Sequence, residues 1–105
     1  MHARLATVNV EIWIEDDLQR FPGDRVTPER HLAFSYVDSA SATPMEAVRR
    51  AWHITNGAIM RLDQEDLVLR QEWSVLAPGM AVSVGDVVRV DGAGWLCTTT
   101  GWDRV

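Results

Sequence analysis

The sequence contains no lysine, and cysteine occurs only once, at Cys97. A single cysteine excludes an internal disulfide and a zinc site built from cysteines. All ten basic residues are therefore arginines, and they stand against fifteen acidic residues, which gives a formal net charge of −5. This balance argues against nucleic-acid binding, because a nucleic-acid interface needs a clustered basic surface.

Long apolar runs are also missing. No stretch approaches the roughly 20 apolar residues that a membrane-spanning helix needs, and the first ten residues lack the pattern of a signal peptide. We therefore expect a cytoplasmic protein with no membrane partner. A chain of 105 residues, of which 47% are hydrophobic, is long enough for one core, so we expect a single domain over residues 1–105.

The last quarter of the chain carries the clearest structural pattern. Gly85-Asp86 is typical of a turn, and the β-branched run 87–90 that follows is typical of a strand. Residues 91–94 predict a hairpin loop and 95–100 predict the returning strand, with Gly101-Trp102 ending the ladder.

Side chains alternate across a strand, which predicts that Val88 and Val90 face the core while Arg89 faces water. The same rule places Trp95 and Cys97 together on one face of the returning strand. It leaves open whether that face is the buried one.

Two further strands are predicted near the N-terminus. Residues 7–15 alternate, and the expected core face is Val8, Val10, Ile12 and Ile14. Residues 31–37 alternate as well and are expected to pair antiparallel with the first strand. Their predicted common face is Leu32, Phe34 and Tyr36.

Thr43 to Glu46 reads as a helix start, with threonine as the N-cap, proline in the first turn and the glutamate of a capping box. We expect this helix to run to Thr55 and to stop at Asn56-Gly57. Its expected buried stripe is Met45, Val48, Ala51, Trp52 and Thr55, with Arg49, Arg50 and His53 toward or beyond the edge. From 58 to 78, a second short helix ending at Trp73 and an edge strand both fit.

Together these patterns predict an α+β fold: an antiparallel sheet of four to five strands with one principal helix packed on one face. The expected order is β-β-α, then a helix or a strand, then β-β.

No residue set predicts catalysis, a metal or a cofactor. Cys97 lies mid-strand without an activating neighbour, and a buried structural role fits it better. His2, His31 and His53 match no metal-ligand spacing. The acidic run 15–17 is expected to be a solvated turn.

Trp13 is the strongest candidate for a binding residue. The alternation of residues 7–15 places it opposite the aliphatic core, between Glu11 and Glu15, which is an unusual position for a large apolar group. Either a loop or the chain terminus packs over Trp13, or Trp13 with Glu11 and Glu15 forms a partner-binding surface.

From about Trp52 onward the chain resembles small uncharacterised proteins of actinobacteria and their phages that are related to the YodL-like domain. The resemblance is carried by Trp52-His53-Ile54-Thr55-Asn56, Val82 to Val88, Asp91-Gly92, Cys97 and Gly101-Trp102. It implies a small accessory protein of the kind encoded on mobile elements. The family supplies no catalytic residue.

The function expected from the sequence is a soluble, non-enzymatic protein-interaction module, such as a phage- or plasmid-type accessory factor. A homodimer through an exposed strand edge would fit this role. The alternative is a small-molecule-binding or enzymatic domain with a pocket between helix and sheet near His53 and Cys97.

Overall fold

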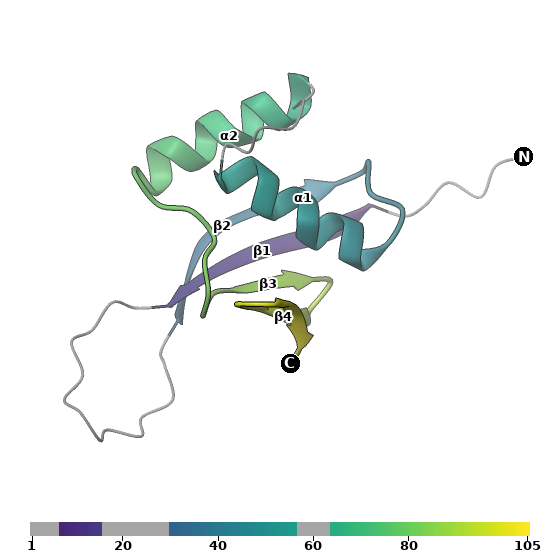
Figure 1. Cartoon of the computed structure of the whole chain (residues 1–105). Helices are drawn as coiled ribbons and strands as arrows, with labels where there is room; N and C mark the ends of the chain where they lie inside the picture. The colour runs from purple at the N-terminus through teal and green to yellow at the C-terminus, as the bar shows by residue number, and fades with distance from the viewer. Residues whose placement is uncertain (1–6, 16–29, 57–63) are drawn as a thin grey trace, which may run out of the picture.

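The computed structural model describes residues 7–15, 30–56 and 64–105. These residues form an α+β fold, as the sequence predicts. The elements are β1 (Val8–Glu15), β2 (Arg30–Asp38), α1 (Pro44–Asn56), α2 (Gln64–Leu76), β3 (Val87–Val90), β4 (Ala93–Thr98) and β5 (Gly101–Arg104). The strands make one antiparallel sheet in the order β2-β1-β3-β4-β5 (Figure 1).

The prediction for β1 is confirmed, because Val10, Ile12 and Ile14 are buried. β2 pairs antiparallel with β1, but its register shifts between Ile12 and Trp13. Ile12 pairs with Phe34 while Trp13 pairs with Leu32, so Ala33 has no partner on β1 and the strand contains a bulge. The prediction that Leu32 shares one face with Phe34 is therefore wrong, and Leu32 is 45% exposed.

The last three strands are joined by tight turns. Asp91 and Gly92 have φ values of 48° and 83°, as a two-residue type I′ hairpin requires, so β4 begins earlier than predicted, at Ala93. Gly101 does not end the ladder but starts a fifth strand, in which Trp102 pairs with Cys97. Cys97 is buried, which identifies its face of β4 as the core face.

Helix α1 begins as its capping signal predicts. The hydroxyl oxygen of Thr43 accepts a hydrogen bond from the Glu46 N–H at 3.1 Å. The Glu46 carboxylate reaches back to the N–H of Ala42 at 2.7 Å, one residue before the position that a capping box predicts. The buried stripe is wider than expected, since Ala47 and Ile54 are also fully buried.

Between residues 58 and 78 the sequence fits either a short helix or an edge strand, and the structure contains the helix, α2. Trp73 is its buried residue, and the ring meets Phe34 of β2 edge-on with the centroids 6.0 Å apart. The indole N–H of Trp73 donates to the Met80 carbonyl at 2.8 Å, which ties the following loop to the helix. Helix α1 ends at Asn56, and Gly57 of the predicted Asn56-Gly57 stop lies outside the described residues.

Arg50 of α1 is the residue whose environment the sequence least suggests. The sequence places it toward or beyond the edge of the buried stripe of α1, yet its side chain is only 11% exposed. Its Nη1 lies 3.0 Å from Oδ1 of Asp38 at the end of β2, and its Nε donates to Asp66 of α2 at 2.6 Å. Oε1 of Glu65 lies 3.5 Å from Nη2 of Arg50, and the Glu65 side chain is more exposed than those of Asp38 and Asp66. One guanidinium thus joins three elements.

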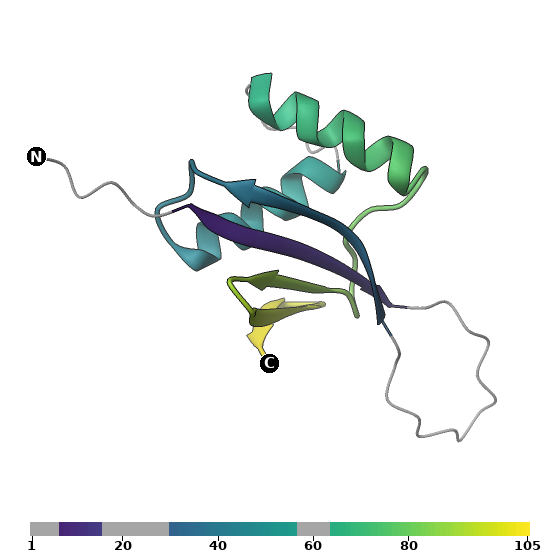
Figure 2. The same cartoon turned by 180° about the vertical axis from the view of Figure 1, so that it is seen from behind.

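Both helices lie on one face of the sheet. In Figure 1 the ribbon of α1 crosses in front of the strands, and in Figure 2 the strands pass in front of α1. The core lies between this face and the helices. Among the described residues, no helix lies on the other face, which we call the outer face.

The Asp38 carboxyl should make the stability of the fold depend on pH. Burial alone raises the pKa of Asp38, but hydrogen bonds from Ser41 and Ala40 and the charge of Arg50 outweigh burial and hold the pKa below its usual value. A carboxyl of this kind stabilises the fold fully above its unfolded pKa, about 3.9, and loses its effect as the pH falls through the folded pKa.

We therefore expect the free-energy difference between the parent and Asp38→Asn to be largest near about pH 6 and to shrink below about pH 4. Urea unfolding of both proteins across this range measures it. A difference that stays constant down to about pH 2 would show that the Asp38 charge does not stabilise the fold.

Candidate functional site

The outer face carries the residues that the sequence singles out. The alternation of β1 places Glu11, Trp13 and Glu15 there, and all three are half-buried. The structure therefore confirms the orientation of Trp13 away from the core. Whether these residues bind a partner stays a prediction.

An apolar row crosses the outer face at the level of Trp13. The strand register pairs Trp13 with Leu32 on one side and with Val87 on the other, and Val87 pairs in turn with Leu96. Directly paired residues of antiparallel strands share a face of the sheet. Four strands thus contribute one apolar residue each to a single line across the sheet.

The Trp13 ring is held by its polar neighbours. The guanidinium carbon of Arg89 lies 5.1 Å from the ring centroid, which is cation–π geometry. The indole N–H donates to Oε1 of Glu11 at 3.3 Å. Glu11 and Arg89 are themselves directly paired across β1 and β3. These contacts orient the ring while leaving it partly exposed.

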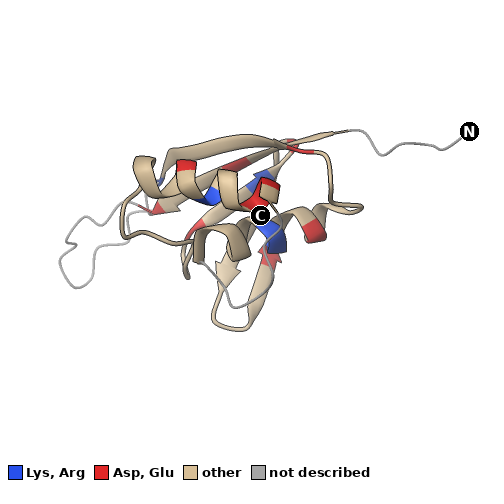
Figure 3. Cartoon of the chain, turned by 90° about the horizontal axis from the view of Figure 1, so that it is seen from above, with Lys and Arg blue, Asp and Glu red and all other residues tan. Residues whose placement is uncertain are grey.

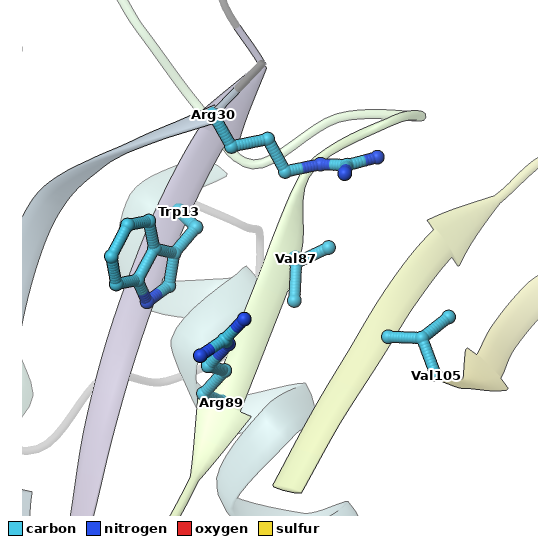
Figure 4. Close-up of a pocket in the computed structure, with 5 residues that line it drawn as sticks. All are labelled: Trp13, Arg30, Val87, Arg89 and Val105. Atoms are coloured by element: carbon cyan, nitrogen blue, oxygen red, sulfur yellow. The ribbon is translucent and has the colours of Figure 1, made fainter. Parts of the chain in front are cut away.

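A hollow of about 230 Å³ lies beside the ring. It is lined by Trp13, Arg30, Val87, Arg89 and Val105, which Figure 4 shows projecting from the sheet on the side away from α1. Two guanidinium groups flank an apolar floor formed by Val87. Such a hollow can accept an apolar side chain that stands next to a carboxylate.

Arg30 is fixed in this arrangement by the turn before β3. Its Nε donates to the Gly85 carbonyl at 2.8 Å, and its strand neighbour is Glu15. Gly85 has a φ of 99°, and a Cβ at this position would lie 2.0 Å from Oε2 of Glu15. The positive φ favours glycine here, whereas the Glu15 oxygen is the end of a flexible side chain that can shift; the contact places Glu15 at the border of the site.

The adjacent Asp86 holds the ends of two strands together. Its carboxylate is buried and accepts the N–H of Glu15 and the N–H of Ser83, both at 2.8 Å. Ser83 thus helps to shape the turn. The consequence for the site is that the β1 end bearing Trp13 is fixed against the start of β3.

Sequence reasoning missed Arg30, Val87, Arg89 and Val105 as members of the site. The pattern of 87–90 does predict that Arg89 points to water, but not that β3 lies beside β1. Trp13 is neither fully covered nor fully exposed. Arg89 packs on the ring, and Val105 borders the same hollow without burying it.

The alternative site near His53 and Cys97 gains no support from the structure. Burial raises the pKa of the Cys97 thiol, and the charge of Asp86 raises it further, so the reactive thiolate is disfavoured. The His53 ring packs edge-on against Trp52, with centroids 5.3 Å apart. The hollows at Trp13, on α2 and at the β2 edge are lined by other residues.

The remaining sequence candidates do not converge. In the part of the chain that the structure describes, no three His, Cys, Asp or Glu side chains are grouped so that they could hold a metal ion. His2, Asp16 and Asp17 lie outside that part. Arginines and acidic residues are interspersed along the described elements rather than gathered by sign (Figure 3).

The chain matches no protein-family model, no curated protein and no solved structure. None of the described helices is long and apolar enough to cross a membrane.

Cys97 should react slowly with a thiol reagent such as Ellman's reagent in the native protein. Burial restricts access, and the raised pKa lowers the thiolate fraction at pH 8. The same chain in denaturant serves as the reference for a free thiol. Equal rates in the native and denatured states would show that the thiol is accessible, and a faster native rate would favour the enzyme alternative.

Proposed function

We propose that this chain is a non-enzymatic protein-interaction domain that binds a partner protein through the outer face of its sheet, with Trp13 as the anchor. The observation that carries the proposal is the position of Trp13. A half-buried tryptophan lies in an apolar row on the face without helices, next to a hollow flanked by Arg30 and Arg89.

The composition of this surface supports the proposal. Tryptophan and arginine are enriched at the energetic centres of protein interfaces, where they supply large contact area and directed hydrogen bonds. The Trp13 ring is already oriented by Arg89 and Glu11, and Arg30 is already bound to Gly85. Binding therefore orders few additional side chains, which lowers the entropy that association costs.

The charges indicate what the partner presents. The two arginines line the hollow itself, while Glu11 and Glu15 are their strand neighbours at its border. We expect a partner segment in which an apolar side chain enters beside Trp13 and a neighbouring carboxylate meets Arg30 or Arg89.

The resemblance to actinobacterial and phage proteins related to the YodL-like domain suggests the biological setting. On that basis we propose a cytoplasmic accessory factor of the phage or plasmid type. Among residues 7–15, 30–56 and 64–105, no contact or distance favours the enzymatic alternative over this function.

Trp13→Ala should separate binding from folding. Because the ring is only half-buried, we expect a loss of roughly 1–2 kcal/mol of stability, less than the 3–5 kcal/mol typical of a fully buried tryptophan. Binding should weaken by about 2 kcal/mol or more, which is roughly 30-fold. A partner captured from the native host, then purified and titrated by calorimetry, provides the measurement alongside a urea unfolding curve.

Trp102→Ala is the matched control, because Trp102 is also half-buried but packs against the core cluster on the helix side of the sheet. It should lower stability and leave partner affinity unchanged. The proposal fails if folded Trp13→Ala protein binds the partner as tightly as the parent does.

A further inference from the structure

The two edges of the sheet differ sharply. β5 forms one edge with only four residues, of which Asp103 and Arg104 are charged. β2 forms the other edge with nine residues, and positions 31–37 contain no Asp, Glu, Arg, Lys, Pro or Gly. Short length and charge are devices that keep a sheet edge from pairing with another chain. β5 has both devices, and β2 has only its bulge.

Helix α2 lies along the same edge (Figure 1), and its exposed side carries large apolar side chains among polar ones. Its buried face is made by Trp73, yet Val75 and Leu76 are 75% and 63% exposed. Leu67 and Val68, about two turns earlier, are also exposed. Water thus contacts four large apolar side chains of one 13-residue helix, an arrangement typical of an interaction surface.

Hollows connect the helix to the strand. One, of about 270 Å³, lies between β2 residues 32–35 and Leu76. Another, of about 410 Å³, is formed on α2 by Gln71, Glu72, Val75 and Leu76. Leu76 borders both hollows, so the strand edge and the helix form one surface. Gln71 and Glu72 give it a polar border.

We propose that a second copy of this chain occupies this surface: the two β2 strands pair antiparallel across a two-fold axis, and the two α2 helices pack against each other. An extended peptide would satisfy the strand edge but would leave the far end of α2, at Leu67 and Val68, uncovered. A second copy supplies a strand and an apolar helix in the same relative positions, as an isologous interface requires.

The orientation follows from geometry. Antiparallel pairing of two identical edges places the two-fold axis perpendicular to the sheet, which keeps both α2 helices on the same side. Parallel pairing would put the helices on opposite faces. Only the antiparallel dimer therefore covers both surfaces, and its sheet continues through ten strands with both Trp13 residues on the outer face.

Sedimentation equilibrium tests the proposal. The parent should have the mass of two chains, against 11.8 kDa for one. Val75→Lys/Leu76→Lys should weaken association by at least ~100-fold, because it buries unpaired charge at the interface. Both side chains are exposed in a single chain, so circular dichroism should show an unchanged fold. Val84→Lys, at an exposed position in the turn before β3 and away from both surfaces, is the matched control and should stay dimeric.

A cross-link tests the strand pairing without a charge change. In a Cys97→Ala background, Ser35→Cys places a thiol near the centre of β2, where the two copies approach the two-fold axis. Mild oxidation should yield a covalent dimer, whereas Thr99→Cys, in the turn between β4 and β5, should stay monomeric under denaturing electrophoresis. A parent that is monomeric up to roughly 1 mM, or a dimer that resists Val75→Lys/Leu76→Lys and does not cross-link at Ser35→Cys, overturns the proposal.

The test of the dimer is independent of the test of partner binding at Trp13. Trp13 lies on the outer face and not on the β2 edge, so Trp13→Ala should leave the mass of the dimer unchanged. Conversely, a monomeric Val75→Lys/Leu76→Lys protein should still bind the partner through its outer face.

Discussion

The fold depends on the ion pairs that Arg50 makes inside it. Asp38 ends β2, Arg50 projects from α1 and Asp66 begins α2, and the three side chains meet where little water reaches them. A buried ion pair adds little net stability over an apolar alternative, but each member becomes costly once its partner is lost. Because the three elements must supply the three groups to one place, the cluster fixes both helices on the same face of the sheet.

Because both helices pack on one side of the sheet, they determine which of its surfaces are exposed. The helix side is filled by the core, and two surfaces stay uncovered by the described residues. The outer face combines Trp13 with arginines and glutamates, which suits recognition of a different protein with its own charge pattern. Positions 31–37 of the β2 edge carry no Asp, Glu, Arg or Lys, and α2 exposes large apolar side chains among polar ones, which suits a self-complementary contact. The two surfaces differ in chemistry, so the chain has room for both a partner and a second copy.

Much of the fold follows from local patterns. The alternation of residues 8–15, the Thr43 cap and the Asp91-Gly92 turn each act within a few residues, and the structure contains the elements that they predict. What the sequence did not reveal depends on contacts between distant residues. The bulge at Ala33 breaks an alternation that looks regular, and only the pairing of β1 with β3 brings Arg89 over Trp13. Arg50 looked peripheral because its carboxylate partners lie on other elements.

The most direct test of this account compares Arg50→Met with Arg49→Met, its exposed neighbour on the same helix. Methionine keeps much of the volume of arginine but removes the positive charge that lies against the Asp38 and Asp66 carboxylates. Urea unfolding at neutral pH should show a loss of about 3–5 kcal/mol for Arg50→Met and less than about 0.5 kcal/mol for Arg49→Met. Equal, small losses in the two variants would contradict the claim that the Arg50 cluster holds the helices on one face of the sheet.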